Sequence, residues 1–477
     1  MAATEISVDH IARVEGHGDI RLVIEDGQVT TCEMAVVEPA RLFESMVRGR
    51  SFEEVPYIAS RVCGICSSSH VVTDLRAIEQ VFGVEVTDRT EALRELLLYG
   101  SYLQNHGTHL FVFAAPDFLG HKSVFPLAEG NPELFERALG LKALGNELCT
   151  LVGGRSIHPI TAVMGGFTHE ISADEYLRLA EAMDATREFA LASVDLFRDF
   201  DTVDVQTEGD LLAMVAPGAY PVCTSDTLRF VRAGYDFSAQ DVEEEIGEYP
   251  VGHSAAFLAR ARRTGRPYMT AALARVNASW DALSKDARYA AAKAGLRPPE
   301  YNPFANNIAQ AVELVDVLDR CSALCRRLAA DEFEGSSEPA PFEVRAGRGV
   351  GFTEAPRGAL FQFGHQWGGP YRARFHHDAH GPEYRELGGG YASARRQDGC
   401  RRLRCRPHHP GSGKARPRLR PLPFLQRALT RLSGRGGGGV PRAQAMARSA
   451  EQPTGLFRSL RNLRAGHPGA SAAYSHD

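Results

Sequence analysis

Hydrophobic and polar residues alternate near the start of the chain and then give way to helical spacing. The alternation over residues 20–24, the Asp26-Gly27 pair and an apolar run over residues 29–37 predict a β-hairpin, because Asp-Gly favours the positive φ of a type I′ turn. Apolar residues then recur at helical spacing over three long segments, 90–114, 172–200 and 306–330. Together these patterns predict an α+β fold, predominantly a helical bundle with a small N-terminal β-sheet.

Two of the predicted helices carry start signals. Ser172 followed by Glu175 is the pattern of a capping box, and Asp88 is the expected N-cap of the helix over residues 90–114.

Composition narrows the class of protein. The chain has 477 residues, 44% of them hydrophobic, and its formal net charge is -5. It has no apolar stretch of about 18 residues, which excludes a membrane span by this criterion, and no secretory signal pattern, so we expect a cytoplasmic protein. Its nine cysteines are an odd number spread over a long chain, which favours free or metal-bound thiolates over a disulfide framework.

Residues 363–477 differ in composition from the rest of the chain. They carry a net charge of about +15, against about -20 for residues 1–362, and contain no Ile and a single Val. We therefore expect a domain over residues 1–362 and an irregular basic tail. The tail has no aromatic or helical recognition element, so we expect no nucleic-acid partner. The other interpretation of such a tail is a GC-rich gene read out of frame.

The densest group of candidate ligands is Arg61-x-Cys63-Gly64-x-Cys66-x-x-x-His70. Gly64 permits a tight turn that lets both sulfurs face one ion, and His70 falls on the face of Cys66 if a helix starts there. By itself the pair fits a redox couple, half a zinc site or a soft transition-metal site. Cys321 and Cys325 lie among leucines of a predicted helix, where we expect buried inert thiols.

Five further segments accompany this motif in order along the chain. They are Arg13-Val14-Glu15-Gly16-His17, Pro39-Ala40-Arg41-Leu42-Phe43-Glu44, His106-x-x-His109 with Pro116-Asp117, Gly153-Gly154-Arg155 with His158-Pro159, and Glu354-Ala355-Pro356-Arg357-Gly358. The six together resemble the large subunits of nickel-iron hydrogenases. Their surroundings resemble most the cytosolic members that couple hydrogen to a soluble carrier such as NAD(P) or coenzyme F420.

The resemblance implies a nickel-iron centre whose iron carries cyanide and carbon monoxide. It implies that Cys63 is a terminal nickel ligand and that Cys66 bridges the two metals, for which soft thiolates are suited. Glu15 matches a carboxylate that exchanges protons with a nickel-bound thiolate. Arg357 matches an arginine over the open coordination position, and Asp117 would orient it by a charge-assisted pair.

The resemblance also assigns residues around the centre. His70 matches a residue that hydrogen-bonds the bridging thiolate, and Glu44 matches a carboxylate ligand of a magnesium ion. His106, His109 and His158 are expected to be structural hydrogen-bonding groups inside the bundle.

The implied activity is the reversible conversion of H2 into two protons and two electrons. Electrons leave such a site through iron-sulfur clusters, and the chain has no spare cysteine set for one. The resemblance therefore implies that the partner is a small subunit with iron-sulfur clusters. We expect diaphorase-type subunits as further partners.

The chain departs from the family near its C-terminus. The family closes its nickel site with a second motif, Asp-Pro-Cys-x-x-Cys, which is absent, and Cys400 and Cys405 have a different spacing. Agreement ends after Phe361, where the composition changes, so we hypothesise a frameshift near codon 362. The chain as written would then hold half a nickel site. The alternative is a non-catalytic scaffold related to the quinone-side subunit of respiratory complex I.

Overall fold

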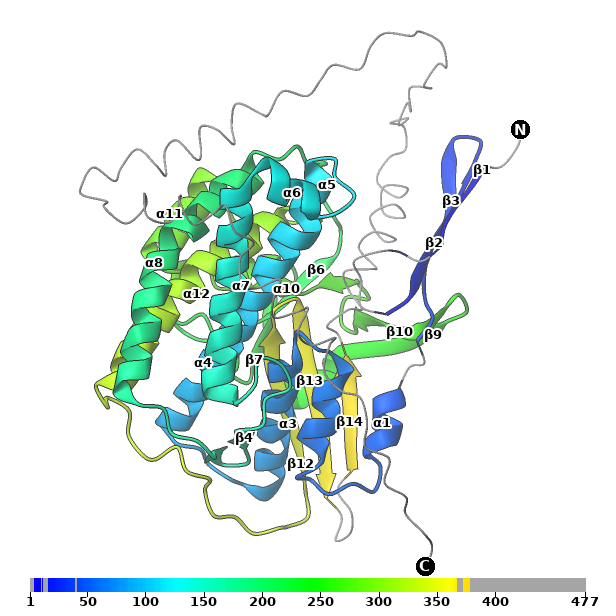
Figure 1. The fold of residues 1–477 in the computed structure, drawn as a ribbon. Coiled ribbons are helices and arrows are strands. Elements are labelled where there is room, and N and C mark those ends of the chain that lie inside the picture. The colour runs from blue at the N-terminus through cyan, green and yellow to red at the C-terminus, as the bar shows by residue number, and fades with distance from the viewer. Residues whose placement is uncertain (1–3, 10, 12–15, 39–40, 367–371, 378–477) are drawn as a thin grey trace, which may run out of the picture. The chain divides into compact units, whose positions relative to one another are not determined.

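The structure, a computed structural model, describes residues 4–9, 11, 16–38, 41–366 and 372–377. The chain divides into two compact units, Met1–His409 and Pro410–Asp477, and every described residue lies in the first. Long helices and several sheets make up this unit (Figure 1). The predicted α+β class is confirmed. The predicted predominance of a helical bundle is not, because the described residues form five sheets rather than one small N-terminal sheet.

The helices and strands follow one another along the whole described part of the chain. The helices are α1 (Leu42–Val47), α2 (Val55–Ala59), α3 (Ser67–Phe82), α4 (Asp88–Gly107), α5 (Ala115–Phe118), α6 (Phe125–Gly130), α7 (Pro132–Gly153), α8 (Ala173–Arg198), α9 (Val242–Glu245), α10 (Ala271–Ala278), α11 (Lys285–Lys293) and α12 (Asn306–Ala329). The strands are β1 (Thr4–Val8), β2 (Gly18–Glu25), β3 (Gln28–Val36), β4 (Ala162–Val163), β5 (Gly166–Phe167), β6 (Asp210–Met214), β7 (Thr227–Phe230), β8 (Tyr235–Ser238), β9 (Ile246–Val251), β10 (Ser254–Ala261), β11 (Tyr268–Met269), β12 (Gly347–Ala355), β13 (Gly358–Gln366) and β14 (Arg372–His377).

The predicted hairpin and helices are present. β2 and β3 pair antiparallel around Asp26 and Gly27, both at positive φ. The predicted capping box of Ser172 begins α8. The N-cap of α4 is Thr87 rather than Asp88, because the Thr87 hydroxyl accepts the Thr90 backbone N–H at 3.1 Å. Beyond α4 the chain continues as a π-helix, Thr108–Ala114, which completes the predicted segment.

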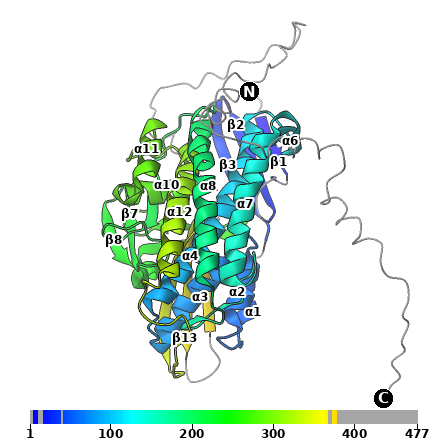
Figure 2. The ribbon, with the colours of Figure 1, turned by 60° about the vertical axis from the view of Figure 1, so that its left-hand side comes forward.

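Four long helices, α4, α7, α8 and α12, run side by side (Figure 2). α12 packs against α8 and α4, and α7 packs against α4. Leu97, Leu148, Leu179 and Leu314, one from each helix, are fully buried. Each such burial stabilises the fold by about 1.5–3 kcal/mol. Within the described residues, no helix has the length and apolarity needed to cross a bilayer.

The sheet β12-β13-β14 packs against α3 on one side and against the four-stranded sheet β11-β6-β7-β8 on the other. Val350 and Phe352 of β12 join Phe230 and Phe361 in a fully buried apolar cluster. The opposite face of β12 carries glycines and touches the backbone of α3. The domain boundary expected between residues 362 and 363 falls inside β13, and β14 belongs to the segment expected to be irregular. Residues 378–477 of that tail lie outside the described residues.

Candidate metal centre

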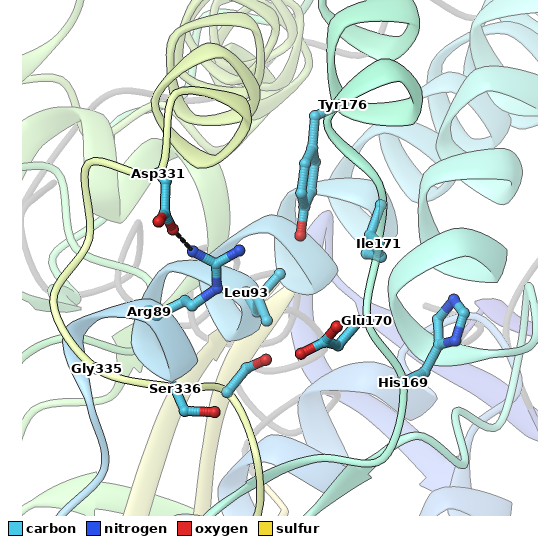
Figure 3. Close-up of a pocket in the computed structure, with 10 residues that line it drawn as sticks. Arg89, Leu93, His169, Glu170, Ile171, Tyr176, Asp331, Gly335 and Ser336 are labelled. Carbon is cyan, nitrogen blue, oxygen red and sulfur yellow. Dashed lines mark hydrogen bonds and ion pairs between the residues drawn. The ribbon is translucent and has the colours of Figure 1, made fainter.

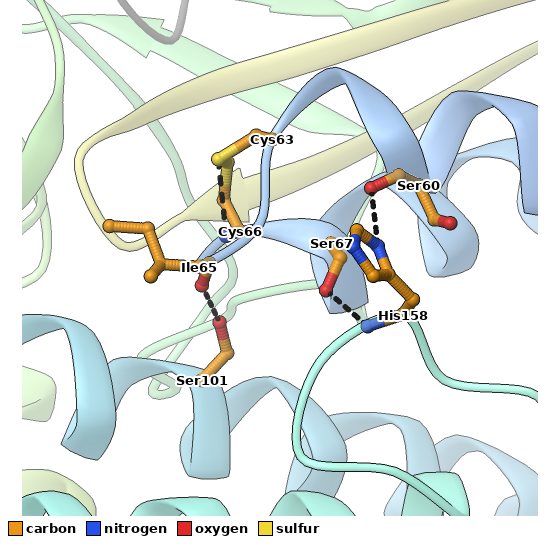
Figure 4. Close-up of a disulfide and its surroundings, with 7 residues drawn as sticks. All are labelled: Ser60, Cys63, Ile65, Cys66, Ser67, Ser101 and His158. Carbon is orange, nitrogen blue, oxygen red and sulfur yellow. Dashed lines mark hydrogen bonds between the residues drawn. A yellow bond between two sulfur atoms is a disulfide. The ribbon is translucent and has the colours of Figure 1, made fainter. Parts of the chain in front are cut away.

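Cys63 and Cys66 lie together at the start of α3. Cys63 has extended backbone and Cys66 is the N-cap of α3, so the chain turns sharply between them. The two form a disulfide with a Cα–Cα separation of 5.5 Å, and the Cys66 backbone N–H donates to Cys63 Sγ at 3.2 Å (Figure 4). Both side chains are buried. Their sulfurs can therefore serve one metal ion, and only after the disulfide is reduced.

Neighbouring elements fix the loop that carries the two cysteines. Ser101 of α4 donates to the Ile65 carbonyl at 3.1 Å (Figure 4). Ser67 Oγ accepts the His158 backbone N–H at 2.8 Å, and His158 Nδ1 lies 2.9 Å from the Ser60 carbonyl oxygen. Burial lowers the pKa of His158, and the charge of Arg61 lowers it further. The neutral imidazole can therefore donate its Nδ1–H to the Ser60 carbonyl, as expected of a structural group.

The turn between β12 and β13 carries Arg357 to the same region. Thr353, near the end of β12, lies 2.5 Å from Thr73 of α3 between the hydroxyl oxygens. Tyr102 of α4 donates to the Glu354 carbonyl at 3.1 Å. Arg357 is half-buried, and its Nε is a buried donor with no hydrogen-bond partner in the described part of the chain. The turn is thus held between α3 and α4, with one arginine donor still to be satisfied.

Two histidines of the predicted motif lie near Arg357, His106 fully buried and His109 half-buried. His109 Nδ1 lies 2.6 Å from Gln310 Oε1. Burial, reinforced by the charge of Arg357, lowers the pKa of His109 to about 3. His106 Nε2 lies 2.7 Å from Glu313 Oε2, and burial lowers its pKa as well. Both are hydrogen-bonded groups of the interior, as expected from the sequence, and both are neutral at pH 7.

A buried ion network lies behind the turn. Arg275 of α10 bonds Glu313 of α12 and Glu354 of β12, and all three are at most 1% exposed. Tyr220 also donates to Glu313, at 2.5 Å. Burial raises the pKa of Glu313, but the charge of Arg275 and the hydrogen bonds from Arg275 and His106 together outweigh it and hold the pKa at about 2. Burial instead dominates for Glu354, and raises its pKa to about 7.

Of the three charged residues of this network, only Glu354 belongs to a sequence motif. Arg275 belongs to no motif. The one sign of the network in the sequence was Glu313, a charged residue on the apolar face of a predicted helix. A buried charge needs a partner, so Glu313 could have been used to predict a buried cation.

The remaining predicted residues lie in several places. His70 is buried on α3, one turn after Cys66. Glu44 of α1 accepts from Arg41 Nη1 at 3.3 Å, and Asp117 is exposed on α5. Glu15 lies outside the described residues. The magnesium ligand at Glu44, the pair of Asp117 with Arg357, and the role of His70 all stay predictions.

A polar cavity of about 230 Å³ lies among other residues (Figure 3). It is lined by residues of α4, of the start of α8 and of the segment after α12. Arg89 pairs with Asp331 at its edge at 2.5 Å, and the Tyr176 hydroxyl points into it. None of the residues singled out in the sequence lines this cavity. We therefore do not assign it to the cysteine pair.

The described residues fit one half of a nickel-iron centre. They bring together two cysteine sulfurs that become soft thiolates once the disulfide is reduced, and they leave a buried donor of Arg357 without an acceptor. Over the same residues, no group of three or more His, Cys, Asp or Glu side chains forms a metal site. The four-thiolate set that the resemblance implies is therefore not completed by the part of the chain that is described.

Comparison with known proteins agrees with this geometry. Residues 41–129 match the family model of nickel-dependent hydrogenases. The alpha chain of sulfhydrogenase 2 of Pyrococcus furiosus is 33% identical over 356 residues, which cover 74% of this chain and 82% of the relative. A chain of the F420-non-reducing hydrogenase vhu of Methanococcus voltae is 28% identical over 381 residues, covering 75% and 90%. The beta chain of the NAD-reducing hydrogenase HoxS of Cupriavidus necator is 32% identical over 216 residues, covering 41% and 44%.

Solved structures show the same fold. An NAD+-reducing [NiFe]-hydrogenase in the H2-reduced state superposes with a TM-score of 0.69 at 22% identity, covering 81% of this chain and 97% of that chain. The [NiFeSe]-hydrogenase of Dm. baculatum superposes with a TM-score of 0.62 at 19% identity, covering 82% and 98%.

Proposed function

We propose, from the premise that this chain belongs to the large subunits of the nickel-dependent hydrogenases, that its natural activity is reversible H2 oxidation coupled to a soluble electron carrier. The members of this family are oxidoreductases that act on hydrogen. The observation that carries the proposal is that the cysteine loop and the Arg357 turn, far apart in the sequence, pack on the same two helices. Ser101 and Tyr102 of α4 bond the Ile65 and Glu354 carbonyls, and Thr73 of α3 meets Thr353.

A nickel-iron centre supplies the heterolytic splitting of H2 when it is bound. Cys63 and Cys66 would hold it on one side, as soft donors suited to both metals. Arg357 would offer its unpartnered Nε–H and a fixed positive charge beside it. Two thiolates do not complete the set of four, so we assign no catalytic step to the chain as written.

The partner and carrier follow from electron flow. The sequence has no cysteine set for an iron-sulfur cluster, so an iron-sulfur small subunit must receive the electrons. A nicotinamide carrier, reached through diaphorase-type subunits, is supported by the name of the NAD-reducing relative. The relatives named for F420 are described as F420-non-reducing, so we place NAD(P) before F420. We also propose that the protein is cytoplasmic and that Glu44 is a ligand of a magnesium ion.

The missing second cysteine pair is proposed to lie in another reading frame. Translation of all three frames from codon 340 to beyond the stop is expected to reveal Asp-Pro-Cys-x-x-Cys after codon 362. If neither alternative frame encodes it, the frameshift hypothesis fails. The alternative function, a nickel-free scaffold related to the quinone-side protein of complex I, then gains support.

A nickel-binding experiment tests the first half of the site directly. Equilibrium dialysis of the reduced, purified chain against Ni²⁺ should show binding that falls at least about tenfold in Cys63→Ser and in Cys66→Ser, because each loses a thiolate. Cys32→Ser is the matched control, since Cys32 lies in β3 and outside the site. Equal binding in all four proteins would refute the assignment.

Activity is tested on the frame-restored chain. Expressed in a hydrogenase-producing host that supplies the maturation machinery, together with its small subunit, it should reduce a viologen dye with H2. A restored protein that holds no nickel and reduces no dye would favour the scaffold alternative.

A further inference from the structure

The turn that carries Arg357 has two buried carbonyl groups, those of Ala355 and Pro356, beside the closing Ala355–Gly358 pair of the β12–β13 ladder. Arg275 satisfies both: Nη1 donates to the Ala355 carbonyl at 2.9 Å, and Nη2 donates to the Pro356 carbonyl at 2.8 Å. The side chain of Arg275 reaches the turn from α10 and is 1% exposed. An unsatisfied buried carbonyl is costly, so the bond to the Pro356 carbonyl in particular helps to hold the turn in place.

The other N–H groups of Arg275 are also engaged. Nη1 donates to Glu354 Oε2 at 3.1 Å, and Nε and Nη2 donate to the two oxygens of Glu313 at 2.6 and 2.9 Å. A guanidinium has five N–H donors in a rigid plane, and here all five have acceptors. Lysine has three donors and no plane, so it cannot reproduce the arrangement.

Arg357 follows directly on the two carbonyls that Arg275 holds. Its own Nε is a buried donor without a partner in the described residues, so this atom adds no bond that would hold the turn. Pro356 fixes one backbone dihedral next to it. The direction in which Arg357 leaves the turn is therefore set by the closing pair of the hairpin and by the bonds that Arg275 makes to the Ala355 and Pro356 carbonyls.

We propose that Arg275, held by Glu313, is a positioning residue that fixes the Glu354–Arg357 turn and so places the Arg357 guanidinium. The proposal rests on the proposed function only in taking Arg357 as the arginine of the hydrogen site. Glu313 anchors Arg275 to α12, while Ala355 and Pro356 receive its outer N–H groups. The placement of Arg357 thus depends on a residue outside every motif of the sequence.

The test measures the turn and Arg357 separately from any metal. Hydrogen–deuterium exchange followed by mass spectrometry reports the amides of residues 353–361 in the full chain. Modification by phenylglyoxal, quantified at Arg357 by peptide mapping, reports the exposure of its guanidinium. The variants are Arg275→Met and Arg275→Lys, and the controls are Arg94→Met and Arg94→Lys. Arg94 is equally buried and fork-paired with Glu79, in a different part of the fold.

Both Arg275 variants should exchange the amides of residues 353–361 about tenfold faster than the unchanged chain. Modification of Arg357 should accelerate by a similar factor, and Arg275→Lys should give no rescue. The Arg94 variants should leave both quantities within about twofold, even where they lower overall stability. If Arg275→Met does not fold, the comparison of Arg275→Lys with Arg94→Lys decides in the same way.

Unchanged exchange and modification in a folded Arg275 variant would overturn the proposal. So would equal acceleration in the Arg94 variants, because that result would reflect general destabilisation. Neither measurement requires nickel. A chain that binds no nickel but shows the expected pattern would refute the proposed function alone, whereas nickel binding without the pattern would refute the positioning role alone.

Discussion

At the scale of single residues, two carboxyl groups on one guanidinium behave in opposite ways. Glu313 takes two charge-assisted bonds from Arg275 and one from Tyr220, so its charged form is favoured and its pKa is held at about 2. Glu354 takes one longer bond from Arg275 and one from the Met214 backbone N–H. Its burial outweighs these bonds and raises its pKa to about 7. Arg275 thus helps to keep Glu313 charged, but it does not offset the effect of burial on the pKa of Glu354.

The raised pKa of Glu354 predicts a pH-dependent stability. Between its usual value of 4.5 and about 7, the folded protein keeps a proton on Glu354 that the unfolded chain releases. This contribution to stability is fully present below pH 4.5 and is lost as the pH rises through 7. The Glu354→Gln variant has no carboxyl group here and should not lose this stability as the pH rises. The difference in free energy of unfolding, variant minus unchanged chain, should therefore increase by about 3 kcal/mol from pH 5 to pH 8.

Urea unfolding at the two pH values measures this difference. Other buried acids with raised pKa values, such as Asp74 and Asp316, are present in both proteins, so the comparison isolates Glu354. Glu338→Gln, in an exposed segment, is the control and should show no relative change. A constant difference between Glu354→Gln and the unchanged chain would contradict the prediction.

Residues differ in how far the sequence could have located them. Cys63 and Cys66 are three positions apart, so local geometry alone brings their sulfurs together. Arg357 is recognisable only within the longer motif that contains it. Arg275 meets that motif through the tertiary fold, 79 residues earlier in the chain than Glu354, and nothing in its own surroundings signals the contact. Local patterns thus indicated Cys63 and Cys66 as candidate ligands. They did not indicate Arg275, which bonds the turn that carries Arg357.

At the scale of elements, β12 lies directly on the backbone of α3. Gly347, Gly349 and Gly351 alternate along one face of the strand, and a Cβ at each would press on the carbonyl oxygens of Val81, Ala77 and Thr73 respectively. Two strand residues advance about 6.6 Å and four helix residues about 6.0 Å, so the glycines stay in step with successive helix turns. Any larger side chain would push the strand away from the helix.

Gly351→Ala should therefore destabilise the protein by about 1–3 kcal/mol or more, because its methyl group would overlap the Thr73 carbonyl oxygen. Chemical denaturation with a circular dichroism readout measures the loss. Gly252→Ala is the matched control, since a Cβ at Gly252 meets nothing within 4 Å. Equal stability of the two variants would show that β12 can move away from α3 at little cost.

Hydrophobic periodicity predicted the helices and strands whose buried face forms a regular apolar pattern along one segment of the sequence. The long helices α4, α8 and α12 follow their apolar spacing, and the hairpin of β2 and β3 follows Asp26-Gly27. β12 was not predicted, because glycines replace the apolar residues on one of its faces. On that face β12 contacts the backbone of α3 rather than apolar side chains, so the strand shows no alternation of apolar residues.

At the scale of the whole molecule, charge is divided unevenly along the chain. Residues 1–362 carry about -20 and residues 363–477 about +15, so the near-neutral total hides two strongly charged parts. Since β13 and β14 extend to His377, a truncation that spares the sheet must end there.

This division predicts the behaviour of the full chain towards polyanions. The full chain should bind heparin at low salt and release it as salt rises, whereas a chain ending at His377 should not bind. Neither should prefer one DNA sequence over another in competition binding, since the basic charge lacks a recognition element. Sequence-selective binding that the truncation abolishes would instead restore a nucleic-acid role for the tail.

The contact between β12 and α3 also sets the order of events during synthesis. Thr73 and Thr353, whose hydroxyl groups meet between α3 and β12, are 280 positions apart in the chain. A ribosome adding about 5–20 residues per second makes the first long before the second. For tens of seconds the cysteine loop exists without the strand that covers α3 and without the arginine turn. Nascent chains thus expose Cys63 and Cys66, which the folded structure buries, and if these cysteines are to bind a metal they must be kept reduced through that interval.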